Sequence, residues 1–307
     1  MMKKKTILFA LVAALAATAL TPTLMAQPAP DPAKWRVLDP ENTLYIDTAD
    51  GRIVLEMFPE IAPRHVARVK ELTRAHFYDG LVFHRVIDRF MAQTGDPQGD
   101  GRGASPLPDL PQEFTFKRGP DLPFVSASEQ SGSWQGFYKT LAIATYPDAQ
   151  MALTADGKTR AWALHCPGIA SMARSGIVNG VDQVNSANSQ FFLMRAPYPS
   201  LDTNYTAWGR VVWGQDAVMK IPVGEPPPTP GRMQTVRVAV DMPEAERAPI
   251  YVLRTDSPDF RQLLDKTRRE RGADFSVCDV QIPVRVIDQS GRNERERPWW
   301  RNIPLIP

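Results

Sequence analysis

Cysteine and histidine are scarce in this chain of 307 residues, which contains two cysteines and four histidines. Two cysteines cannot build a disulfide framework, so the fold must depend on its own hydrophobic core. The histidines, cysteines and carboxylates form no cluster with the spacing of metal ligands. His65 and His76 fall in one helical pattern but eleven residues apart, which favours solvent exposure over ligation. We therefore expect no metal and no cofactor.

A charge excess of one sign is also missing, because 36 basic residues face 34 acidic ones. This balance gives no electrostatic reason to expect nucleic-acid binding. With 43% hydrophobic and 23% charged residues, disorder throughout the chain is excluded. No Gly-x-Ser-x-Gly motif occurs, so a Ser–His–Asp hydrolase is not supported. Proline is abundant, with 29 residues, and predicts many turns and loops.

Long apolar runs are absent except near the N-terminus, where a basic stretch at residues 3–5 precedes an apolar stretch at 7–20. The apolar stretch is about 14 residues long, too short to span a bilayer comfortably. We predict a signal peptide over residues 1–26, cleaved after Ala26. Cleavage after Ala19 is the alternative, and an uncleaved anchor is a less favoured one. The expected mature protein has no membrane span and is periplasmic.

Short segments with strand character follow, separated by turn signals. There are eight, at residues 43–48, 53–58, 81–87, 90–95, 169–172, 190–194, 208–213 and 236–240. One clear helix begins at Pro63 and ends before Gly80, so a parallel βαβ fold is disfavoured. Closure of an antiparallel sheet removes exposed strand edges. We predict a mainly β fold: a closed eight-stranded antiparallel barrel over residues 40–240, with one or two capping helices.

Two segments fall outside this barrel. Residues from about 97 to 167 are irregular and predict a long loop insertion, with one hairpin turning at Asp156-Gly157. Residues 241–307 predict a small C-terminal α/β extension. It contains a helix over 258–271, begun by a Ser-Pro pair, and a strand over 277–286.

Three separated motifs have the residue types of one site. They are Phe83–Asp96 (FHRVIDRFMAQTGD), Gly168–Arg174 (GIASMAR) and Asn188–Leu193 (NSQFFL). In order and spacing they resemble the cyclophilins, the barrel-type peptidyl-prolyl cis–trans isomerases, and the bacterial exported members in particular. The resemblance extends from about Leu44 to Val240, with a longer loop after the first motif, and implies a cyclophilin-like barrel.

The resemblance implies the site residues. The family's catalytic arginine falls on Arg85, and a glutamine that can hold the substrate carbonyl falls on Gln93. The expected substrate-binding residues are Phe90, Met91, Ala173, Arg174, Gln190, Phe192, Leu201 and Tyr205. Arg174 replaces a small amide, Ser200 replaces a large aromatic residue, and Tyr205 replaces a histidine. The open rim at Ser200 predicts weak inhibition by cyclosporin, the typical inhibitor of the family.

The chemistry of prolyl isomerisation suits these residue types. Rotation about a peptide bond has a barrier of ~18–20 kcal/mol but breaks no bond, so it requires no nucleophile or metal. An enzyme must bind the twisted amide more tightly than either planar form. The Arg85 guanidinium can donate a hydrogen bond to the pyramidal proline nitrogen. An apolar cup would hold the proline ring away from water and strengthen that bond. The cup would consist of Phe90, Met91, Phe192 and Leu201.

Alternatives remain for several residues. By composition alone the apolar residues of the cup fit a barrel core equally well, and Phe191 is assigned to the core. His84 is expected to be a structural, hydrogen-bonded histidine. The predicted function is isomerisation of X–Pro bonds in unfolded or loop segments of exported proteins. A chaperone that binds proline-containing segments with weak or no turnover is the alternative.

The sequence allows two interpretations of the two cysteines. Cys166 lies at the end of the insertion, and Cys278 lies in the predicted strand of the extension. Export would permit a disulfide between them, which would fix the extension against the barrel near the substrate groove. A loop of this length gives about 4–5 kcal/mol in a chain-entropy model. The other reading is two separately buried thiols.

Overall fold

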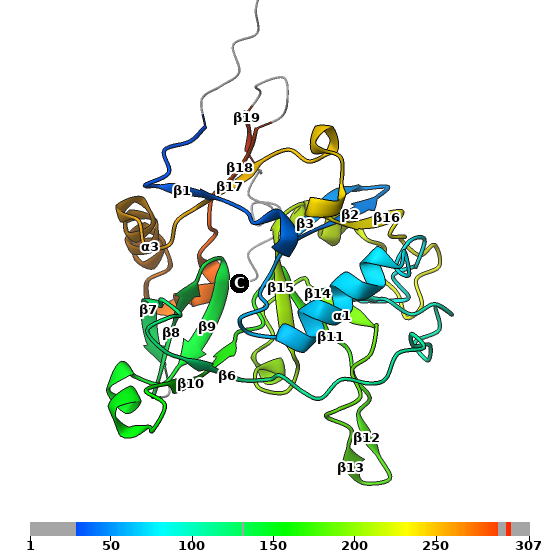
Figure 1. The fold of residues 1–307 in the computed structure, drawn as a ribbon, viewed down its shortest axis with the longest axis horizontal. Coiled ribbons are helices and arrows are strands. Elements are labelled where there is room, and N and C mark those ends of the chain that lie inside the picture. Colours follow the sequence, from blue (N-terminus) through cyan, green and yellow to red (C-terminus); the bar gives the residue numbers. More distant parts are fainter. Residues whose placement is uncertain (1–28, 131, 288–292, 296–307) are drawn as a thin grey trace, which may run out of the picture.

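The structure is a computed structural model that describes residues 29–130, 132–287 and 293–295 (Figure 1). The predicted signal peptide lies outside these residues. Within the described part of the chain, no helix has the length and apolar character needed to cross a membrane.

The main sheet has eight antiparallel strands in the order β16-β2-β3-β15-β11-β14-β5-β4. Their bounds are β2 Thr43–Thr48, β3 Gly51–Met57, β4 Arg85–Ile87, β5 Met91–Thr94, β11 Ile169–Met172, β14 Phe191–Met194, β15 Ala207–Trp213 and β16 Thr235–Val238. Each predicted strand segment overlaps one of these strands. The prediction of a mainly β, eight-stranded antiparallel fold is confirmed.

The sheet is curled, and its edge strands β4 and β16 are not ladder partners, unlike in the closed barrel that we expected. The chain before β16 meets the other edge through isolated bridges instead. Val86 of β4 donates its amide to the Gly224 carbonyl at 2.8 Å and accepts the Gly224 amide at 2.9 Å. A second bridge joins Val82 and Arg232. A connecting segment, and not a continuous ladder, therefore brings the two edges together.

Helix α1 (Pro63–Arg74) begins with a proline in its first turn and buries Val66, Val69 and Leu72. The expectation that His65 is exposed is wrong. His65 is buried, and its Nδ1 lies 2.7 Å from Glu113 Oε2. Residues three and four apart share one side of a helix. The His65 side chain therefore lies on the same buried face of α1 as Val69 and Leu72. A short helix α2 (Gln215–Lys220) follows β15.

The insertion is an additional sheet and not a long loop. Its five antiparallel strands run in the order β6-β10-β9-β8-β7. They are β6 Phe116–Arg118, β7 Val125–Gln130, β8 Ser133–Tyr138, β9 Leu141–Thr145 and β10 Thr159–Ala163. The predicted hairpin at Asp156-Gly157 is wrong, because a 3-10 helix (η2, Asp148–Leu153) precedes the turn and β10 pairs with β6 and β9. Every residue of β9 is buried, so its sequence lacks the alternation that indicates a strand.

The C-terminal extension forms a four-stranded sheet with a strand from the beginning of the described chain. The order is β1-β17-β18-β19, with β1 Trp35–Val37, β17 Ile250–Leu253, β18 Val284–Ile287 and β19 Asn293–Arg295. The predicted helix is confirmed as α3 (Pro258–Arg271), and the Ser257 side chain accepts a hydrogen bond from the Phe260 amide. The predicted strand over 277–286 is shorter, because its first residues form a 3-10 turn (η7, Val277–Asp279).

The remaining elements are short. A hairpin of β12 (Ile177–Val178) and β13 (Val181–Asp182) connects β11 to β14. Five further 3-10 helices occur within the described residues: η1 Pro40–Asn42, η3 Pro199–Leu201, η4 Ala239–Asp241, η5 Glu244–Glu246 and η6 Gly272–Asp274.

Two apolar clusters lie on opposite faces of the main sheet. Phe191 packs in the cluster that also contains α1, as expected for a core residue. The next residue of β14, Phe192, packs in the other cluster because neighbouring side chains on a strand point to opposite faces. The second cluster includes residues of the insertion and the extension, and Phe137 contacts Phe260 with ring centroids 5.3 Å apart. The two added regions therefore share one core with the outer face of the barrel.

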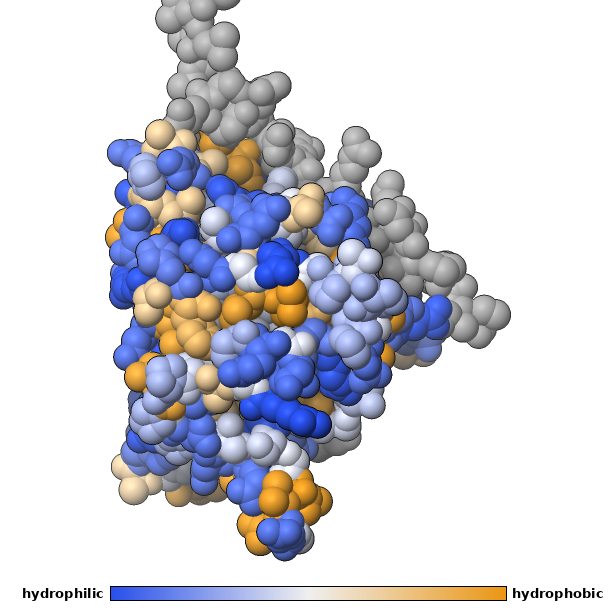
Figure 2. Space-filling model, turned by 90° about the vertical axis from the view of Figure 1, so that its right-hand side faces the viewer, coloured by the Kyte–Doolittle hydropathy of each residue, from blue (hydrophilic) through white to orange (hydrophobic). Residues whose placement is uncertain are grey.

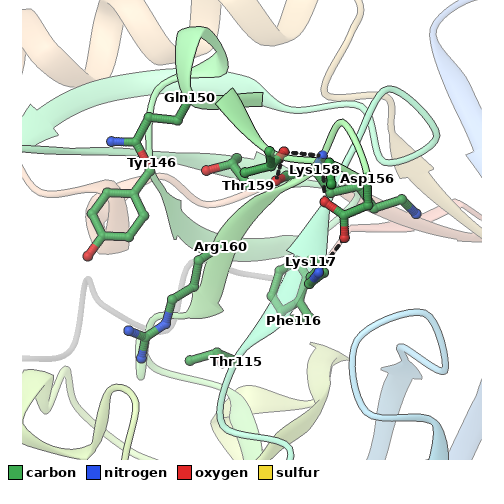
Figure 3. Close-up of a pocket in the computed structure, with 11 residues that line it drawn as sticks. Thr115, Phe116, Lys117, Tyr146, Gln150, Asp156, Lys158, Thr159 and Arg160 are labelled. Carbon is green, nitrogen blue, oxygen red and sulfur yellow. Dashed lines mark hydrogen bonds and ion pairs between the residues drawn. The ribbon is translucent and has the colours of Figure 1, made fainter. Parts of the chain in front are cut away.

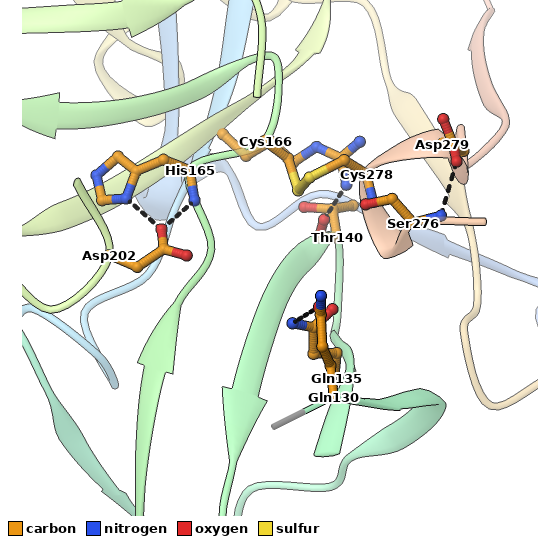
Figure 4. Close-up of a disulfide and its surroundings, with 10 residues drawn as sticks. Gln130, Gln135, Thr140, His165, Cys166, Asp202, Ser276, Cys278 and Asp279 are labelled. Atoms are coloured by element: carbon orange, nitrogen blue, oxygen red, sulfur yellow. Dashed lines mark hydrogen bonds and ion pairs between the residues drawn. A yellow bond between two sulfur atoms is a disulfide. The ribbon is translucent and has the colours of Figure 1, made fainter. Parts of the chain in front are cut away.

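A disulfide joins Cys166 to Cys278, with the Cα atoms 5.1 Å apart (Figure 4). Cys166 precedes β11, and Cys278 lies in the turn η7 and not in a strand as expected. The bond ties the extension to the start of the barrel strand that ends beside Ala173.

Candidate functional site

Three neighbouring strands place the two predicted catalytic residues and one predicted substrate-binding residue in one row. Arg85 on β4 is the direct cross-strand partner of Gln93 on β5, and Gln93 is the partner of Phe192 on β14. Direct partners on adjacent strands have side chains on the same face of the sheet. The sheet register therefore brings together residues from two of the three motifs.

The Arg85 guanidinium is held from two sides. Its Nε donates to Glu225 Oε2 at 2.7 Å, and its Nη1 lies 3.5 Å from Gln93 Oε1. Glu225 follows Gly224, which bridges to β4 and closes the sheet. No local pattern around Glu225 indicates this role, because its proximity to Arg85 depends on sheet closure.

A chain of side-chain amides continues from Gln93. Its Nε2 donates to Gln190 Oε1 at 2.9 Å. Gln190 Nε2 in turn donates to the carbonyls of Gly101 and Gly103, at 3.1 and 2.8 Å. Both glutamine side chains are thereby fixed in orientation, with Gln93 adjacent to Arg85.

The loop that receives Gln190 is organised by one carboxylate. Asp96 accepts hydrogen bonds from the amides of Gln98, Asp100 and Gly101 at 2.8, 3.0 and 2.5 Å. Burial raises the pKa of Asp96, but backbone amide donors, those of Gln98 and Gly101 among them, outweigh it, and the pKa lies below its ordinary value. The ionised carboxylate fixes the backbone that orients Gln190.

The predicted apolar cup is largely assembled. Met91, Phe192 and Leu201 are buried in one cluster, and Leu201 lies on η3. Partly buried residues pack against the same cluster, among them Phe90, Ala173 and Tyr205. The rings of Phe192 and Tyr205 meet edge to face, with centroids 5.7 Å apart. The Phe90 and Tyr198 ring centroids lie 4.4 Å apart, and Ser200, two residues after Tyr198, is exposed.

Beneath Phe192 lies a hydrogen-bonded Asp–His–Ser set that no motif indicated. Asp202 Oδ1 accepts from the His165 amide at 2.8 Å and from its Nδ1 at 2.9 Å (Figure 4). His165 Nε2 then accepts the Ser171 hydroxyl at 2.8 Å. Although these residue types resemble a hydrolase triad, Ser171 is fully buried and cannot reach a substrate. The His165 ring stacks on Phe192, with centroids 6.4 Å apart, so the set supports the cup.

The Arg174 side chain binds neighbouring residues of the protein and does not point freely into the substrate groove. Its Nε donates to the Asn204 carbonyl at 3.0 Å, and its Nη1 donates to Asp182 Oδ1 at 2.5 Å. The guanidinium also lies 4.9 Å from the centroid of the Tyr205 ring. Arg174 therefore fixes Tyr205 and the β12–β13 hairpin. The neighbouring Ala173 donates its amide to the Gln190 carbonyl at 2.9 Å.

His84 differs from the expectation of a hydrogen-bonded histidine. It is buried, and within the described part of the chain neither ring nitrogen has a hydrogen-bond partner. Burial lowers the pKa of His84 below its ordinary value of 6.5, and the nearby Arg85 acts in the same direction. The imidazole is therefore neutral near pH 7.

A separate concavity of about 1060 Å³ lies on the insertion sheet (Figure 3). Its lining comes from β6, from η2, from β10 and from the turn between η2 and β10, and includes Tyr146 and Arg160. None of the predicted site residues lines it. Across residues 29–130 and 132–287, no group of His, Cys, Asp and Glu side chains could hold a metal ion.

Comparisons with known proteins show which proteins this chain resembles. The family model described as "Cyclophilin type peptidyl-prolyl cis-trans isomerase/CLD" matches residues 43–239. A probable peptidyl-prolyl cis-trans isomerase from Brucella suis is 37% identical over 197 residues, which cover 61% of this chain and 74% of that protein. The peptidyl-prolyl cis-trans isomerase cypE of Dictyostelium discoideum is 30% identical over 181 residues, covering 59% and 85%.

A solved structure extends the similarity beyond the barrel. The crystal structure of cyclophilin AquaCyp293 from Hirschia baltica is 34% identical, with a TM-score of 0.75. The match covers 83% of this chain and 94% of that chain, a larger share than the family model covers.

Proposed function

Because the chain belongs to the cyclophilin family and is a peptidyl-prolyl cis–trans isomerase, we propose that it assists the folding of exported proteins. Its substrates are X–Pro bonds in unfolded or loop segments of those proteins. The observation that carries this proposal is the Arg85 guanidinium, held by Glu225 and Gln93 beside the apolar cup.

Arg85 acts on the twisted amide. When the C–N bond rotates, the proline nitrogen loses conjugation and its lone pair becomes an acceptor for the guanidinium. Glu225 accepts the hydrogen bond from Arg85 Nε, and Gln93 accepts from Nη1. The Nη groups therefore supply the hydrogen bond to the proline nitrogen. Hydrogen bonds to charged groups contribute ≈ 1.5–3 kcal/mol, or about one to two factors of ten in rate if made only in the transition state.

The cup binds the ring that carries this nitrogen. Met91, Phe192 and Leu201 present a buried apolar floor, and Tyr205 meets Phe192 at its edge. Exclusion of water from the ring lowers the local dielectric constant and strengthens the Arg85 contact. The anchored Gln93 side chain holds the carbonyl that precedes proline as the amide turns.

The test is a protease-coupled assay on an Ala-Pro peptide. Arg85→Lys replaces a planar fork of donors by a mobile point charge, and we expect kcat/KM to fall about tenfold or more, equivalent to ~1.4 kcal/mol. The thermal midpoint should not change. Arg89→Lys is the matched control, since Arg89 is an exposed arginine just beyond β4. An unchanged rate for Arg85→Lys would remove this residue from the mechanism.

Export to the periplasm is the second part of the proposal. Its support is the basic stretch at residues 3–5 followed by the apolar run at 7–20. The Cys166–Cys278 bond is consistent with an oxidising compartment. Fusion of the first thirty or so residues to a reporter active only after export tests the signal. N-terminal sequencing of the exported protein locates the cleavage site, which we expect after Ala26.

A further inference from the structure

A hairpin projects from the barrel between β11 and β14. Its strands are β12 (Ile177–Val178) and β13 (Val181–Asp182), and it forms the protruding end below the barrel in Figure 1. Asn179 and Gly180 make the turn with positive φ angles of 51° and 80°. This is the geometry of a type I′ turn, which matches the twist of the two strands. The hairpin is therefore a defined element of the fold.

The tip of this hairpin is apolar and exposed to solvent. Ile177, Val178 and Val181 are 74%, 50% and 62% exposed. Figure 2 shows an apolar knob at the projecting end of the molecule. Single exposed apolar residues are common on protein surfaces, but these three lie within five positions on one protrusion. A cluster of exposed apolar side chains on one protrusion points to an interaction site.

The base of the hairpin is joined to the substrate groove through Arg174. The Arg174 guanidinium binds Asp182 and lies against Tyr205, at the edge of the proline cup. Ile177 is the direct cross-strand partner of Asp182, so both side chains are on the same face of the hairpin. The base of the hairpin is thus joined to the side of the groove that Tyr205 forms through Arg174, and the apolar tip lies beyond this link.

The root of the hairpin is also fixed by hydrogen bonds. The Ser175 amide donates to Ser186 Oγ at 2.8 Å, and the Gln183 amide donates to the Gly176 carbonyl at 3.2 Å. These bonds close the base of the hairpin, and the Arg174 contacts hold that base beside Tyr205.

We propose that this tip binds an apolar stretch of the same client polypeptide whose proline occupies the cup. The inference rests on the proposed function and names a second subsite for it. An unfolded chain exposes apolar side chains near its prolines, and those side chains are complementary to Ile177, Val178 and Val181. A short peptide fills the cup alone, whereas a long chain contacts both the cup and the tip.

The test compares a short and a long substrate. A triple variant, Ile177→Thr, Val178→Thr and Val181→Thr, keeps β-branched side chains in the strands while reducing the apolar surface. We expect its kcat/KM on an Ala-Pro tetrapeptide to stay within about twofold of wild type. Its catalysis of refolding of a denatured protein with a slow prolyl phase should fall by roughly five- to tenfold, because remote binding energy is lost only with the long substrate.

A matched control changes exposed apolar residues elsewhere. Leu153 and Val37 are 85% and 56% exposed and lie outside the hairpin, on η2 and β1. The double variant Leu153→Thr and Val37→Thr should leave both rates unchanged. If the triple variant unfolds at the assay temperature, Ile177→Thr alone carries the test, since Ile177 is the most exposed of the three.

The outcomes separate the two proposals. A wild-type protein without tetrapeptide activity overturns the proposed function. A wild-type protein active on both substrates, with a triple variant equal to it on both, overturns the subsite and leaves the isomerase intact. Sedimentation tests whether the tip instead binds a second copy of this chain. A wild-type dimer that becomes monomeric in the triple variant would make the tip an interface between copies and overturn the proposal.

Discussion

Arg85 Nε and Glu225 Oε2 lie 2.7 Å apart although the two residues are separated by 140 positions in the chain. Arg85 is on β4, and Glu225 lies in the segment that closes the curled sheet beside it. Both side chains are partly exposed, so the pair contributes at most about 1 kcal/mol to stability. In the mechanism that we propose, it orients the guanidinium toward the groove.

Glu225→Ala should therefore lower activity more than stability. We expect kcat/KM on an Ala-Pro peptide to fall by about two- to fivefold, equivalent to ~0.4–1 kcal/mol. Glu225→Gln retains an oxygen that can accept from Arg85 Nε and should keep most of the activity. Rates and thermal midpoints of both variants are measured together. Equal activity of the alanine variant and wild type would contradict an orienting role.

Asp202 supports the cup through His165, and its removal should affect both stability and activity. Asp202→Ala leaves the buried His165 amide and Nδ1 without an acceptor. We expect a loss of about 1–3 kcal/mol in the free energy of unfolding. Denaturant titration measures it, and Asp202→Asn, which retains an acceptor oxygen, is the control. If both variants are as stable as wild type, the set beneath Phe192 has no structural role.

Ser200 leaves the rim of the cup open, so cyclosporin should bind weakly to the unmodified protein. Ser200 is exposed on η3, next to the buried Leu201. Ser200→Trp adds a large apolar wall, and burial of an aromatic side chain against a ligand favours binding. We expect inhibition to become roughly tenfold stronger, a gain of ~1.4 kcal/mol. Calorimetry that shows tight binding to the unmodified protein would refute this reading.

The Cys166–Cys278 bond should stabilise the extension. It closes a loop between positions 112 apart, and a chain-entropy model gives such a loop at most about 4–5 kcal/mol. Reduction with dithiothreitol should lower the denaturant midpoint of the wild type and leave a Cys166→Ser, Cys278→Ser variant unaffected. Thiol titration of denatured, unreduced protein should find no free thiol. Two free thiols in exported material would disprove the bond.

His84 predicts a pH dependence of stability. Burial lowers its folded-state pKa below the ordinary value of 6.5, with Arg85 adding to this shift and Asp96 and Asp100 opposing it. Between the folded and unfolded pKa values only the unfolded chain binds the proton, so stability falls as the pH drops below about 6.5. His84→Gln cannot titrate and should lose part of this dependence. Denaturant midpoints of wild type and His84→Gln at about pH 7 and pH 5 measure this difference. An equal change of midpoint with pH in the two proteins would contradict the prediction.

Local signals were sufficient for much of the fold. The Ser257-Pro258 pair indicates the start of α3 because a serine side chain accepts the Phe260 amide and proline suits the first turn. Alternation and turn residues located the eight strands of the main sheet, since half-buried strands show a period of two. The resemblance of the first and third motifs implied Arg85, Gln93 and Phe192 as site residues, and the sheet register places these three in one row.

The remaining features depend on contacts between distant segments. Strand β9 is buried along its whole length and therefore has no alternation to reveal the insertion sheet. His65 lies on the buried stripe of α1, and its hydrogen-bond partner, Glu113, comes from a segment 48 positions away.

Glu225 reaches Arg85 only because the chain before β16 closes the curled sheet. Asp202, His165 and Ser171 meet beneath Phe192 only because their segments fold together. The resemblance of three sequence motifs indicated the family and the candidate site residues, and periodicity with turn residues indicated the barrel strands. The partners that orient its groove were decided by tertiary structure, because their proximity arises from sheet closure and long-range packing, which leave no pattern in the local sequence.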